Sequence, residues 1–173
     1  SITGGAINFN PSVVKISVTG ATTTYGLDVQ DLNGDRRPEI IVNQFNNNNI
    51  FIITNTSSLS TVSFWTVQSI SLTGTLNHLT TADFNEDGKH DIAVTSAFDK
   101  KAFVLLNTTS GSSITFGTPL PFDTGDGPFG IDVSDIDGDD DVDIVVGNID
   151  INTAAADTEI TVLRNEGSNS PVS

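Results

Sequence analysis

Three short segments of the chain carry oxygen-bearing side chains in the same pattern. They begin at Asp31, Asp83 and Asp135, at a constant spacing of 52 residues. Counted from these residues, Asp, Asn or Glu stands at positions 1, 3, 5 and 9, and the backbone carbonyl of position 7 can join them. Calcium takes roughly six to eight hard oxygen ligands, which loops of alternating carboxylates supply. The pattern therefore predicts about three calcium sites.

The predicted ligands form three sets of five residues. Site one consists of Asp31, Asn33, Asp35, the carbonyl of Arg37 and Glu39; site two of Asp83, Asn85, Asp87, the carbonyl of Lys89 and Asp91; site three of Asp135, Asp137, Asp139, the carbonyl of Asp141 and Asp143. Ten of the 22 acidic residues supply side-chain ligands in these sets. Like charges at such spacing repel one another unless a cation lies among them.

These segments differ from an EF-hand, although positions 1, 3 and 5 agree. An EF-hand needs a glutamate at position 12 and a flanking helix, whereas position 12 here is Val42, Val94 or Val146, in an apolar run typical of a strand. For a single loop of this kind, a row of Asx-type turns is the alternative interpretation. Three loops at equal spacing favour metal binding. The many protein oxygens favour calcium over magnesium, which prefers a tight octahedron that keeps several waters.

The rest of the chain is typical of short strands separated by clusters of Gly, Asn, Asp and Ser. Each unit holds about four strands, the last of which is Phe64–Ser71 or Thr115–Phe122 in the first two units. Four strands at a period near 50 residues are typical of a β-propeller blade. We therefore predict an all-β fold of the β-propeller type with three four-stranded blades. It forms a single repeat domain over residues 1–173, with approximate repeats 10–62, 63–114 and 115–173.

The two ends of the chain carry complementary parts of one blade. The chain opens with a fourth-strand pattern at Ser12–Val18 and closes after a third strand at Glu159–Asn165, and about six inserted residues fall in Asn148–Asp157. The N-terminal strand is therefore expected to complete a last blade. Two arrangements follow equally from this pattern. Either two copies form a six-bladed ring as a homodimer, or the chain is part of a larger propeller.

Several motifs resemble a known family. The acidic loops, the pairs Tyr25-Gly26 and Phe129-Gly130, and the run Leu105-Leu106-Asn107 resemble the FG-GAP/VCBS-type repeats of integrin-α-like β-propellers and of many secreted bacterial proteins. The resemblance covers nearly the whole chain. It implies that each nine-residue loop binds calcium between the first two strands of a blade, and that the protein is extracellular or lies on the cell surface.

The loops depart from this family pattern at position 6, which usually is a glycine because the backbone there is left-handed. Only site two keeps the glycine, as Gly88, whereas Arg36 and Asp140 replace it in loops that have glycine at position 4 instead. Asp tolerates a left-handed backbone better than Arg does. We therefore expect site one to bind calcium most weakly and site three, with its extra carboxylate, most tightly.

The charge and composition of the chain limit its partners. The formal net charge of −15 repels nucleic acid and anionic membranes. No apolar run approaches the roughly 18 residues of a membrane helix, so membrane insertion is not expected. The chain has no cysteine for a disulfide, no methionine and no visible signal peptide. We expect it to be a processed or excised part of a longer precursor.

Side chains for other chemistry are few, and no enzymatic activity is expected. We interpret His78, which stands where the other units have glycine, as a spacer, and we expect His90 in the second acidic loop to face solvent. The equivalent residues Asp28 and Asp132 are candidates to line a channel, which makes a glycoside hydrolase the enzyme alternative. Four aromatic residues are expected to pack inside blades: Phe64, Trp65, Phe116 and Phe122.

These observations favour a secreted or cell-surface calcium-binding propeller module in which calcium is structural, because closed oxygen loops leave no open position for catalysis. Such a lectin-like or adhesion module would bind a glycan or a protein ligand through loops such as Phe45–Asn49 or Asn148–Asp157. The alternative is a structural propeller that binds no ligand and is attached to a secreted enzyme. The fold alone does not decide between them.

Overall fold

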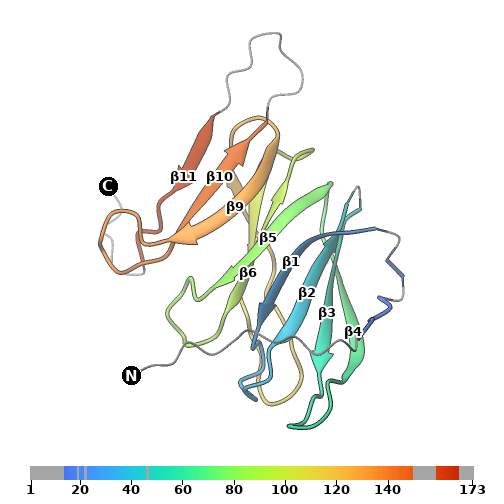
Figure 1. Cartoon of the computed structure of the whole chain (residues 1–173). Helices are drawn as coiled ribbons and strands as arrows, with labels where there is room; N and C mark the ends of the chain where they lie inside the picture. The colour runs from blue at the N-terminus through green and yellow to red at the C-terminus, as the bar shows by residue number, and fades with distance from the viewer. Residues whose placement is uncertain (1–13, 19, 22, 46, 150–158, 168–173) are drawn as a thin grey trace, which may run out of the picture.

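The computed structural model of the protein describes residues 14–18, 20–21, 23–45, 47–149 and 159–167. Within these residues the chain folds into three antiparallel β-sheets that are joined by turns and loops (Figure 1). This described part contains no helix, and hence none that is long and apolar enough to cross a membrane.

Each sheet is one blade, and its strands follow one another along the chain. Blade 1 consists of β1 (Thr24–Gln30), β2 (Glu39–Gln44), β3 (Asn49–Asn55) and β4 (Phe64–Ser71). Blade 2 consists of β5 (Leu76–Ala82), β6 (Asp91–Ser96), β7 (Lys101–Leu105) and β8 (Leu120–Asp123). Blade 3 consists of β9 (Pro128–Ser134), β10 (Asp143–Asn148) and β11 (Ile160–Leu163). The predicted four-stranded blade is therefore confirmed for blades 1 and 2, whereas blade 3 has three strands in the described residues.

Alternate residues of each second strand point to opposite neighbours. In β2, Ile41 packs toward blade 2, whereas Val42 points to the opposite face. In β6, Val94 packs toward blade 1 and Ala93 toward blade 3. Strands that are covered on both faces have continuous apolar sequences, which explains the runs after each acidic loop. We call the face toward the following blade the forward face, and the other the backward face.

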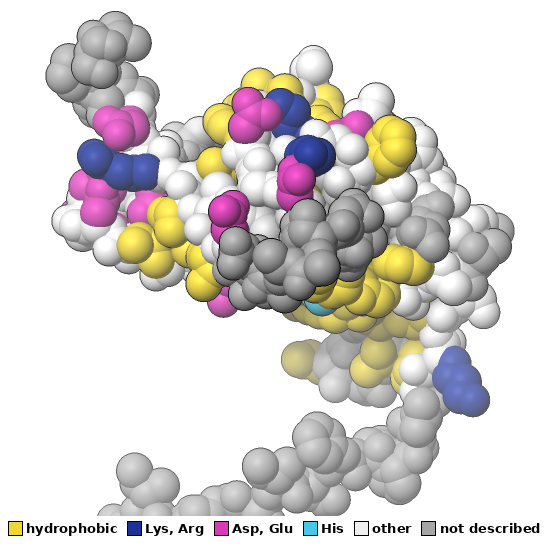
Figure 2. Space-filling model, turned by 90° about the horizontal axis from the view of Figure 1, so that it is seen from above, with side chains coloured by type: hydrophobic (Ala, Val, Ile, Leu, Met, Phe, Trp, Pro, Cys, Tyr) yellow, Lys and Arg dark blue, Asp and Glu magenta, His cyan; other side chains and the backbone are white. Residues whose placement is uncertain are grey.

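Two apolar layers hold the blades together. The first is formed by Ile41, Ile50 and Ile52 of blade 1 with Ile92, Val94, Phe103 and Leu105 of blade 2, and the second by Ala93, Ala102 and Val104 of blade 2 with Ile144 and Val146 of blade 3. Hydrophobic side chains also reach the surface in patches among acidic and basic ones (Figure 2).

The first strands β1, β5 and β9 lie side by side (Figure 1). The last ladder pairs between the first and second strands are Gln30 with Glu39, Ala82 with Asp91, and Ser134 with Asp143. The loops that connect the first and second strands are therefore equal in length, and the three acidic segments are equivalent hairpin loops.

The fourth strand of blade 2 is shorter than predicted. The prediction began at Thr115, whereas β8 begins at Leu120. Phe116 forms only an isolated bridge with Asn107. The next residues include Pro119, which has no N–H to give to a ladder.

The N-terminal segment also differs from the prediction. Ser12 lies outside the described residues, and residues 14–18 belong to no strand. Ile16 and Val18 instead pack on the backward face of blade 1, against a cluster that includes Val42 and Phe51. The inserted stretch Asn148–Asp157 lies largely outside the described residues.

Candidate metal centres

The last predicted ligand of each acidic loop is also the first residue of the second strand of its blade. Glu39, Asp91 and Asp143 hold this place, at loop position 9. Their exposed fractions are 0, 0 and 1 %, whereas residues near the loop tips are exposed. A buried carboxylate is costly unless it is hydrogen-bonded and paired with a cation or coordinates a metal.

Each position-9 carboxylate accepts two backbone hydrogen bonds. One comes from the N–H of loop position 2, and the other comes from the asparagine that follows the third strand. The donors are Leu32 and Asn55 for Glu39 (3.0 and 3.4 Å), Phe84 and Asn107 for Asp91 (3.0 and 2.7 Å), and Ile136 and Asn165 for Asp143 (2.9 and 2.7 Å). One side chain thus joins the loop, the second strand and the end of the third strand.

The aspartate at position 1 draws each loop around itself, because it accepts hydrogen bonds from backbone N–H groups in the middle of the loop. The donors are Gly34 and Arg36 for Asp31 (2.8 and 2.7 Å), Asp87 and Gly88 for Asp83 (3.1 and 2.8 Å), and Gly138 and Asp140 for Asp135 (2.7 and 3.1 Å). The carboxylate oxygens of position 1 therefore lie toward the interior of the loop.

The position-5 side chains form Asx-type turns. Asp35 accepts a hydrogen bond from the N–H of Arg37 at 2.8 Å, and Asp87 accepts one from the N–H of Lys89 at 2.9 Å. These turns were the alternative to metal binding, but the two interpretations are compatible. An ionised carboxylate has about four lone-pair sites, and the turn occupies only one of them.

Two positions of every loop have a left-handed backbone. The φ angles at position 4 are 78° for Gly34, 57° for Glu86 and 85° for Gly138, and those at position 6 are 66° for Arg36, 83° for Gly88 and 73° for Asp140. Each loop thus has glycine at one of the two positions and a larger residue at the other. The backbone argument for ranking site one last therefore applies equally to site two, because Glu86 carries the same kind of strain.

Carboxylates converge at site three. One oxygen from each of Asp135, Asp137 and Asp143 lies within 4.8 Å of the others. Calcium–oxygen distances of about 2.3–2.6 Å allow ligands of one ion to lie up to roughly 5 Å apart, so the cluster fits calcium. Sites one and two have an amide, Asn33 or Asn85, in place of the middle carboxylate. Every side chain in the three sets offers hard oxygen, the ligand type that calcium prefers.

A basic side chain lies beside each site. The pairs are Arg37 with Asp35 at 2.8 Å, Lys89 with Asp87 at 3.7 Å, and Arg164 with Asp137 at 2.5 Å. Between one third and one half of each of these side chains is exposed. Exposed ion pairs contribute only about 0–1 kcal/mol, so a divalent ion can replace them at small cost.

Burial raises the pKa of Glu39 and the pKa of Asp91 above their ordinary values. The backbone N–H donors lower both pKa values in part, and repulsion from the other carboxylates of the same loop raises them again. A cation among these carboxylates would favour their charged forms.

Four ring side chains form a cluster that was not predicted. The ring centroid of Tyr25 lies 4.9 Å from that of Phe45, 5.0 Å from that of His78 and 5.7 Å from that of Phe129. His78, interpreted as a spacer, also lies 5.2 Å from Phe129. The signal in the sequence was the equivalence of Tyr25 and Phe129. This equivalence predicts a cluster only once β1, β5 and β9 are known to lie side by side.

Several predicted placements were wrong. His90 is partly buried rather than facing solvent, and its Nδ1 is enclosed without a hydrogen-bond partner in the described residues. His90 lines a pocket together with residues of the first acidic loop. Trp65 is 81 % exposed and Phe122 is 42 % exposed, so neither is packed inside a blade. The packing predicted for Phe64 and Phe116 is confirmed.

The paired aspartates of the first strands have different surroundings. Asp28 accepts a hydrogen bond from the hydroxyl of Thr81 at 2.7 Å, across the boundary between blades 1 and 2. Asp132 is exposed. The two carboxylates therefore stand on the forward faces of two different blades, and Asp28 has a structural partner.

Residues 31–94 and 83–146 match the FG-GAP-like repeat family, and both matches begin at position 1 of an acidic loop. The chain belongs to the FG-GAP-like repeat family. FG-GAP repeats fold as propeller blades, and those of integrins bind calcium. The family is typical of extracellular and cell-surface proteins and is generally non-enzymatic. No curated protein matches the chain.

Proposed function

We propose that this FG-GAP protein is a secreted or cell-surface module that binds calcium at all three loops, in a structural role. The buried carboxylate at position 9 of every loop carries the proposal, because it needs a compensating cation. The convergence of Asp135, Asp137 and Asp143 within 4.8 Å supports it at site three. Sites one and two share the same loop length, the same register and the same left-handed positions.

A structural role follows from what each ion would touch. The position-9 carboxylate is hydrogen-bonded to its own loop and to the end of the third strand. An ion held there would neutralise the repulsion within the loop and stabilise the contact of the loop with the second and third strands. A catalytic metal needs an open coordination position beside acid–base groups. The loops instead surround the site with backbone N–H groups and carboxylates.

Thermal unfolding tests this proposal. The melting temperature is measured for metal-depleted protein, for protein in millimolar calcium, and for protein in equal magnesium. A ligand at 100 times its Kd stabilises the native state by about 2.7 kcal/mol per site, so calcium is expected to raise the melting temperature strongly and magnesium much less. An identical melting temperature in all three conditions would overturn the proposal.

We further propose that the module binds a glycan at the aromatic cluster. Tyr25 and Phe45 are 43 and 37 % exposed, and they contact His78 and Phe129 where the first strands come together. Aromatic side chains with one apolar face and one wet end are common in recognition surfaces. Such faces can stack on the apolar side of a sugar ring.

Binding to a glycan array in millimolar calcium tests the ligand site. Wild-type protein is expected to bind, and Tyr25→Ala and Phe45→Ala are expected to abolish binding at a temperature where thermal melting shows that both variants are still folded. Trp65→Ala is the control, because Trp65 is an exposed aromatic residue on the outer strand β4. The absence of binding by folded wild-type protein would reject the glycan site and favour a scaffold without a ligand.

A further inference from the structure

The first acidic loop contains an asparagine that is followed directly by a glycine. Asn33 and Gly34 hold loop positions 3 and 4 and form the single Asn-Gly pair in the sequence. Asparagine is a thermolabile residue, and it reacts with the next backbone nitrogen most readily before glycine, which has no side chain to shield that nitrogen. The other loops have Asp87-Gly88 and Asp137-Gly138, where an ionised carboxylate is a much poorer target for a nucleophile. Site one is therefore the reactive loop of the three.

The second loop offers a matched asparagine with a different neighbour. Asn85 also holds position 3, and its side-chain oxygen accepts a hydrogen bond from the N–H of Asp87 at 3.2 Å. The side-chain oxygen of Asn33 accepts the equivalent bond from Asp35 at 2.9 Å. The next residue differs, because Glu86 stands where the first loop has glycine. The two asparagines thus share one loop position and one hydrogen bond, and they differ in the residue that follows.

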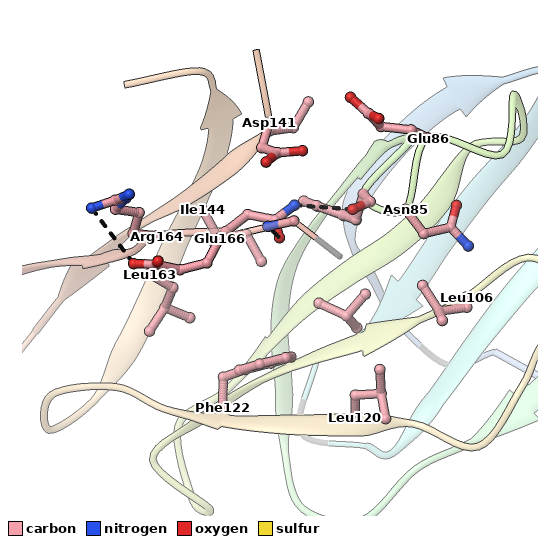
Figure 3. Close-up of a pocket in the computed structure, with 15 residues that line it drawn as sticks. Asn85, Glu86, Leu106, Leu120, Phe122, Asp141, Ile144, Leu163, Arg164 and Glu166 are labelled. Atoms are coloured by element: carbon pink, nitrogen blue, oxygen red, sulfur yellow. Dashed lines mark hydrogen bonds and ion pairs between the residues drawn. The ribbon is translucent and has the colours of Figure 1, made fainter. Parts of the chain in front are cut away.

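The space around the two peptide bonds differs accordingly. Gly34 is exposed, and a Cβ atom placed on it would meet no described atom within 4 Å, its chain neighbours aside. Glu86 has a side chain here, and it lines a pocket of about 470 Å³ between blades 2 and 3 together with Asn85 (Figure 3). The bond between Asn33 and Gly34 therefore has open space and water beside it, as a ring-closing reaction requires.

Hydrogen bonds hold the reacting groups of the first loop. The side-chain nitrogen of Asn33 donates to the carboxylate of Glu39 at 3.4 Å. The backbone N–H of Gly34 donates to the carboxylate of Asp31 at 2.8 Å. Ring closure would remove the proton of Gly34 and expel the side-chain nitrogen of Asn33, so both bonds are lost in the reaction. An intact loop thus stabilises the unreacted asparagine.

A calcium ion at site one would strengthen this restraint. The side-chain oxygen of Asn33 is one of the predicted ligands, and the carboxylates of Asp31 and Glu39 are two others. Without a cation these carboxylates repel each other, which weakens the same hydrogen bonds. The protection rests on the calcium binding proposed above, whereas the reactivity of the Asn-Gly pair does not.

We propose that Asn33 is a site of spontaneous deamidation, and that calcium at site one suppresses the reaction. The backbone nitrogen of Gly34 loses its proton to the solvent and forms a bond to the side-chain carbonyl carbon of Asn33. The bond from this carbon to Nδ2 breaks, and the nitrogen takes up a proton and leaves as ammonia. The product is a cyclic succinimide, which water then opens at either of its carbonyl carbons.

The two directions of ring opening have opposite effects on site one. Attack of water on the former side-chain carbon gives aspartate at position 33, and site one then has carboxylates at positions 1, 3, 5 and 9, as site three has. Attack on the backbone carbon gives isoaspartate, which lengthens the main chain by one atom. The hydrogen bonds from Gly34 and Arg36 to Asp31, at 2.8 and 2.7 Å, then lose their register. The first product strengthens the site, and the second disrupts it.

Peptide mapping by mass spectrometry tests the site. Folded protein is kept at mildly alkaline pH, once in millimolar calcium and once metal-depleted, and the conversion of Asn33 and Asn85 is followed. Asn33 is expected to gain the mass difference between an amide and an acid, and to give both aspartate and isoaspartate. Asn85 is expected to stay unchanged. No conversion of Asn33 in metal-depleted protein, or equal conversion of Asn85, would overturn the assignment.

The same samples test the protection by calcium. Conversion of Asn33 is expected to be roughly tenfold or more slower in calcium, because the ion holds hydrogen bonds that the reaction must break. Equal rates in a protein that calorimetry shows to bind calcium would overturn the suppression alone. Equal rates in a protein that binds no calcium would overturn the proposed calcium sites as well.

An exchange of the following residue tests the cause. Glu86→Gly is expected to make Asn85 convert in metal-depleted protein, and glycine suits the φ of 57° at this position. Asn33→Gln is the control, because glutamine would have to close a larger ring, and no conversion is expected at position 33. Absence of conversion at Asn85 in the Glu86→Gly variant would overturn the role of the following glycine.

Calorimetry measures the consequence for site one. Asn33→Asp represents the aspartate product alone, and it is expected to bind calcium more tightly at this site, because the charge of the ligands tunes the affinity. Wild-type protein that has reacted without calcium also contains isoaspartate, and is expected to bind less calcium than fresh protein. Unchanged binding in both samples would overturn the effect of the modification on site one.

Discussion

The carboxylate at loop position 9 connects the chemistry of each site to the fold. Glu39, Asp91 and Asp143 are buried and bind the backbone on two sides. A neutral amide in this place has only one acceptor atom, so one of the two backbone N–H groups loses its partner. An unsatisfied buried donor costs about 1–3 kcal/mol.

Asp91→Asn is therefore expected to lower the free energy of unfolding by about 1–3 kcal/mol in calcium-free buffer, and to reduce the stabilisation by calcium as well. Urea denaturation measures both effects. Asp126→Asn is the control, since Asp126 is exposed and, among the described residues, forms an ion pair with Lys100 alone. Equal stability of the two variants would contradict the anchoring role of position 9.

The same residues predict an unusual pH dependence. Burial raises the folded-state pKa of Glu39 and of Asp91 above their ordinary values of 4.5 and 3.8. The metal-free folded state then binds more protons than the unfolded state. The extra protons stabilise the folded state fully when the pH is below the ordinary pKa values. This stabilisation is lost as the pH rises through the raised folded-state pKa values.

Metal-depleted wild-type protein is thus expected to lose part of its stability advantage over Asp91→Asn between about pH 4 and neutral pH. In saturating calcium the direction is reversed, because the ion competes with protons for the carboxylate. Melting temperatures of the two proteins across this range, with and without calcium, measure the difference. The same slope in both conditions would show that the carboxylate does not face the ion.

The left-handed positions of the loops give a third prediction at the residue scale. Gly88 has φ 83° and open space around its Cβ position, so Gly88→Ala is expected to cost about 1 kcal/mol from backbone strain alone. Gly117→Ala is the matched control, because Gly117 has ordinary contacts at 3.8 and 3.9 Å and no left-handed φ. Urea unfolding in which the two variants lose equal stability would contradict the strain argument.

At the scale of elements, the asparagine after each third strand joins neighbouring blades. Asn107 is 1 % exposed and donates to the carbonyls of Leu32 and His90 at 2.9 and 3.0 Å. Its side-chain oxygen accepts a hydrogen bond from the N–H of Thr109 at 2.9 Å. This one side chain therefore ties the first acidic loop to blade 2.

Asn107→Ala is expected to destabilise the protein by about 2–4 kcal/mol, because three buried polar groups lose their partner. The control is Asn49→Ala, whose side chain forms hydrogen bonds with the nearby Asn47 and Ser71 and with no residue of blade 2 in the described part of the chain. Denaturant unfolding with monitoring of Trp65 fluorescence measures both changes. A loss no larger than that of the control would show that the link between blades contributes little.

The constant spacing of 52 residues was enough to predict the blades and the hairpin loops. Equivalent strands recur at this spacing, and the first and second strands end their pairing at the same loop positions in every blade. The boundaries of β8 could not be predicted as well, since Pro119 shortens a ladder whose hydrogen bonds are invisible in the sequence. The aromatic cluster was missed because it joins Tyr25, His78 and Phe129 from three different blades.

The sequence predicted the residues of the candidate sites more completely than it predicted the strained backbone positions of the loops. Alternating oxygens at positions 1 to 9 predict the ligands directly, whereas the left-handed backbone at position 4 emerges only from the structure. Glycine stands at one of the two left-handed positions in each loop, and the other is occupied by Arg36, Glu86 or Asp140. The ranking of site one as weakest stays a prediction that now rests on Glu39 alone, whose side chain is longer than the aspartate at position 9 of the other two sites.

At the scale of the whole molecule, the formal net charge of −15 opposes the folded state. Self-repulsion of this size opposes a compact state, and closely spaced acids of the three loops add to it. Three divalent ions neutralise six of these charges. Calcium is thus expected to act on the molecule as a whole, by reducing the repulsion between the acidic loops of the three blades.

The stoichiometry of calcium binding tests this account most directly. Metal-depleted protein is titrated with calcium in a calorimeter, beside a variant that combines Asp31→Asn, Asp83→Asn and Asp135→Asn. We predict three calcium ions per chain for the wild-type protein, with heats and affinity lost in the variant. Binding of no calcium by the folded wild-type chain, or unchanged binding by the triple variant, would contradict the account.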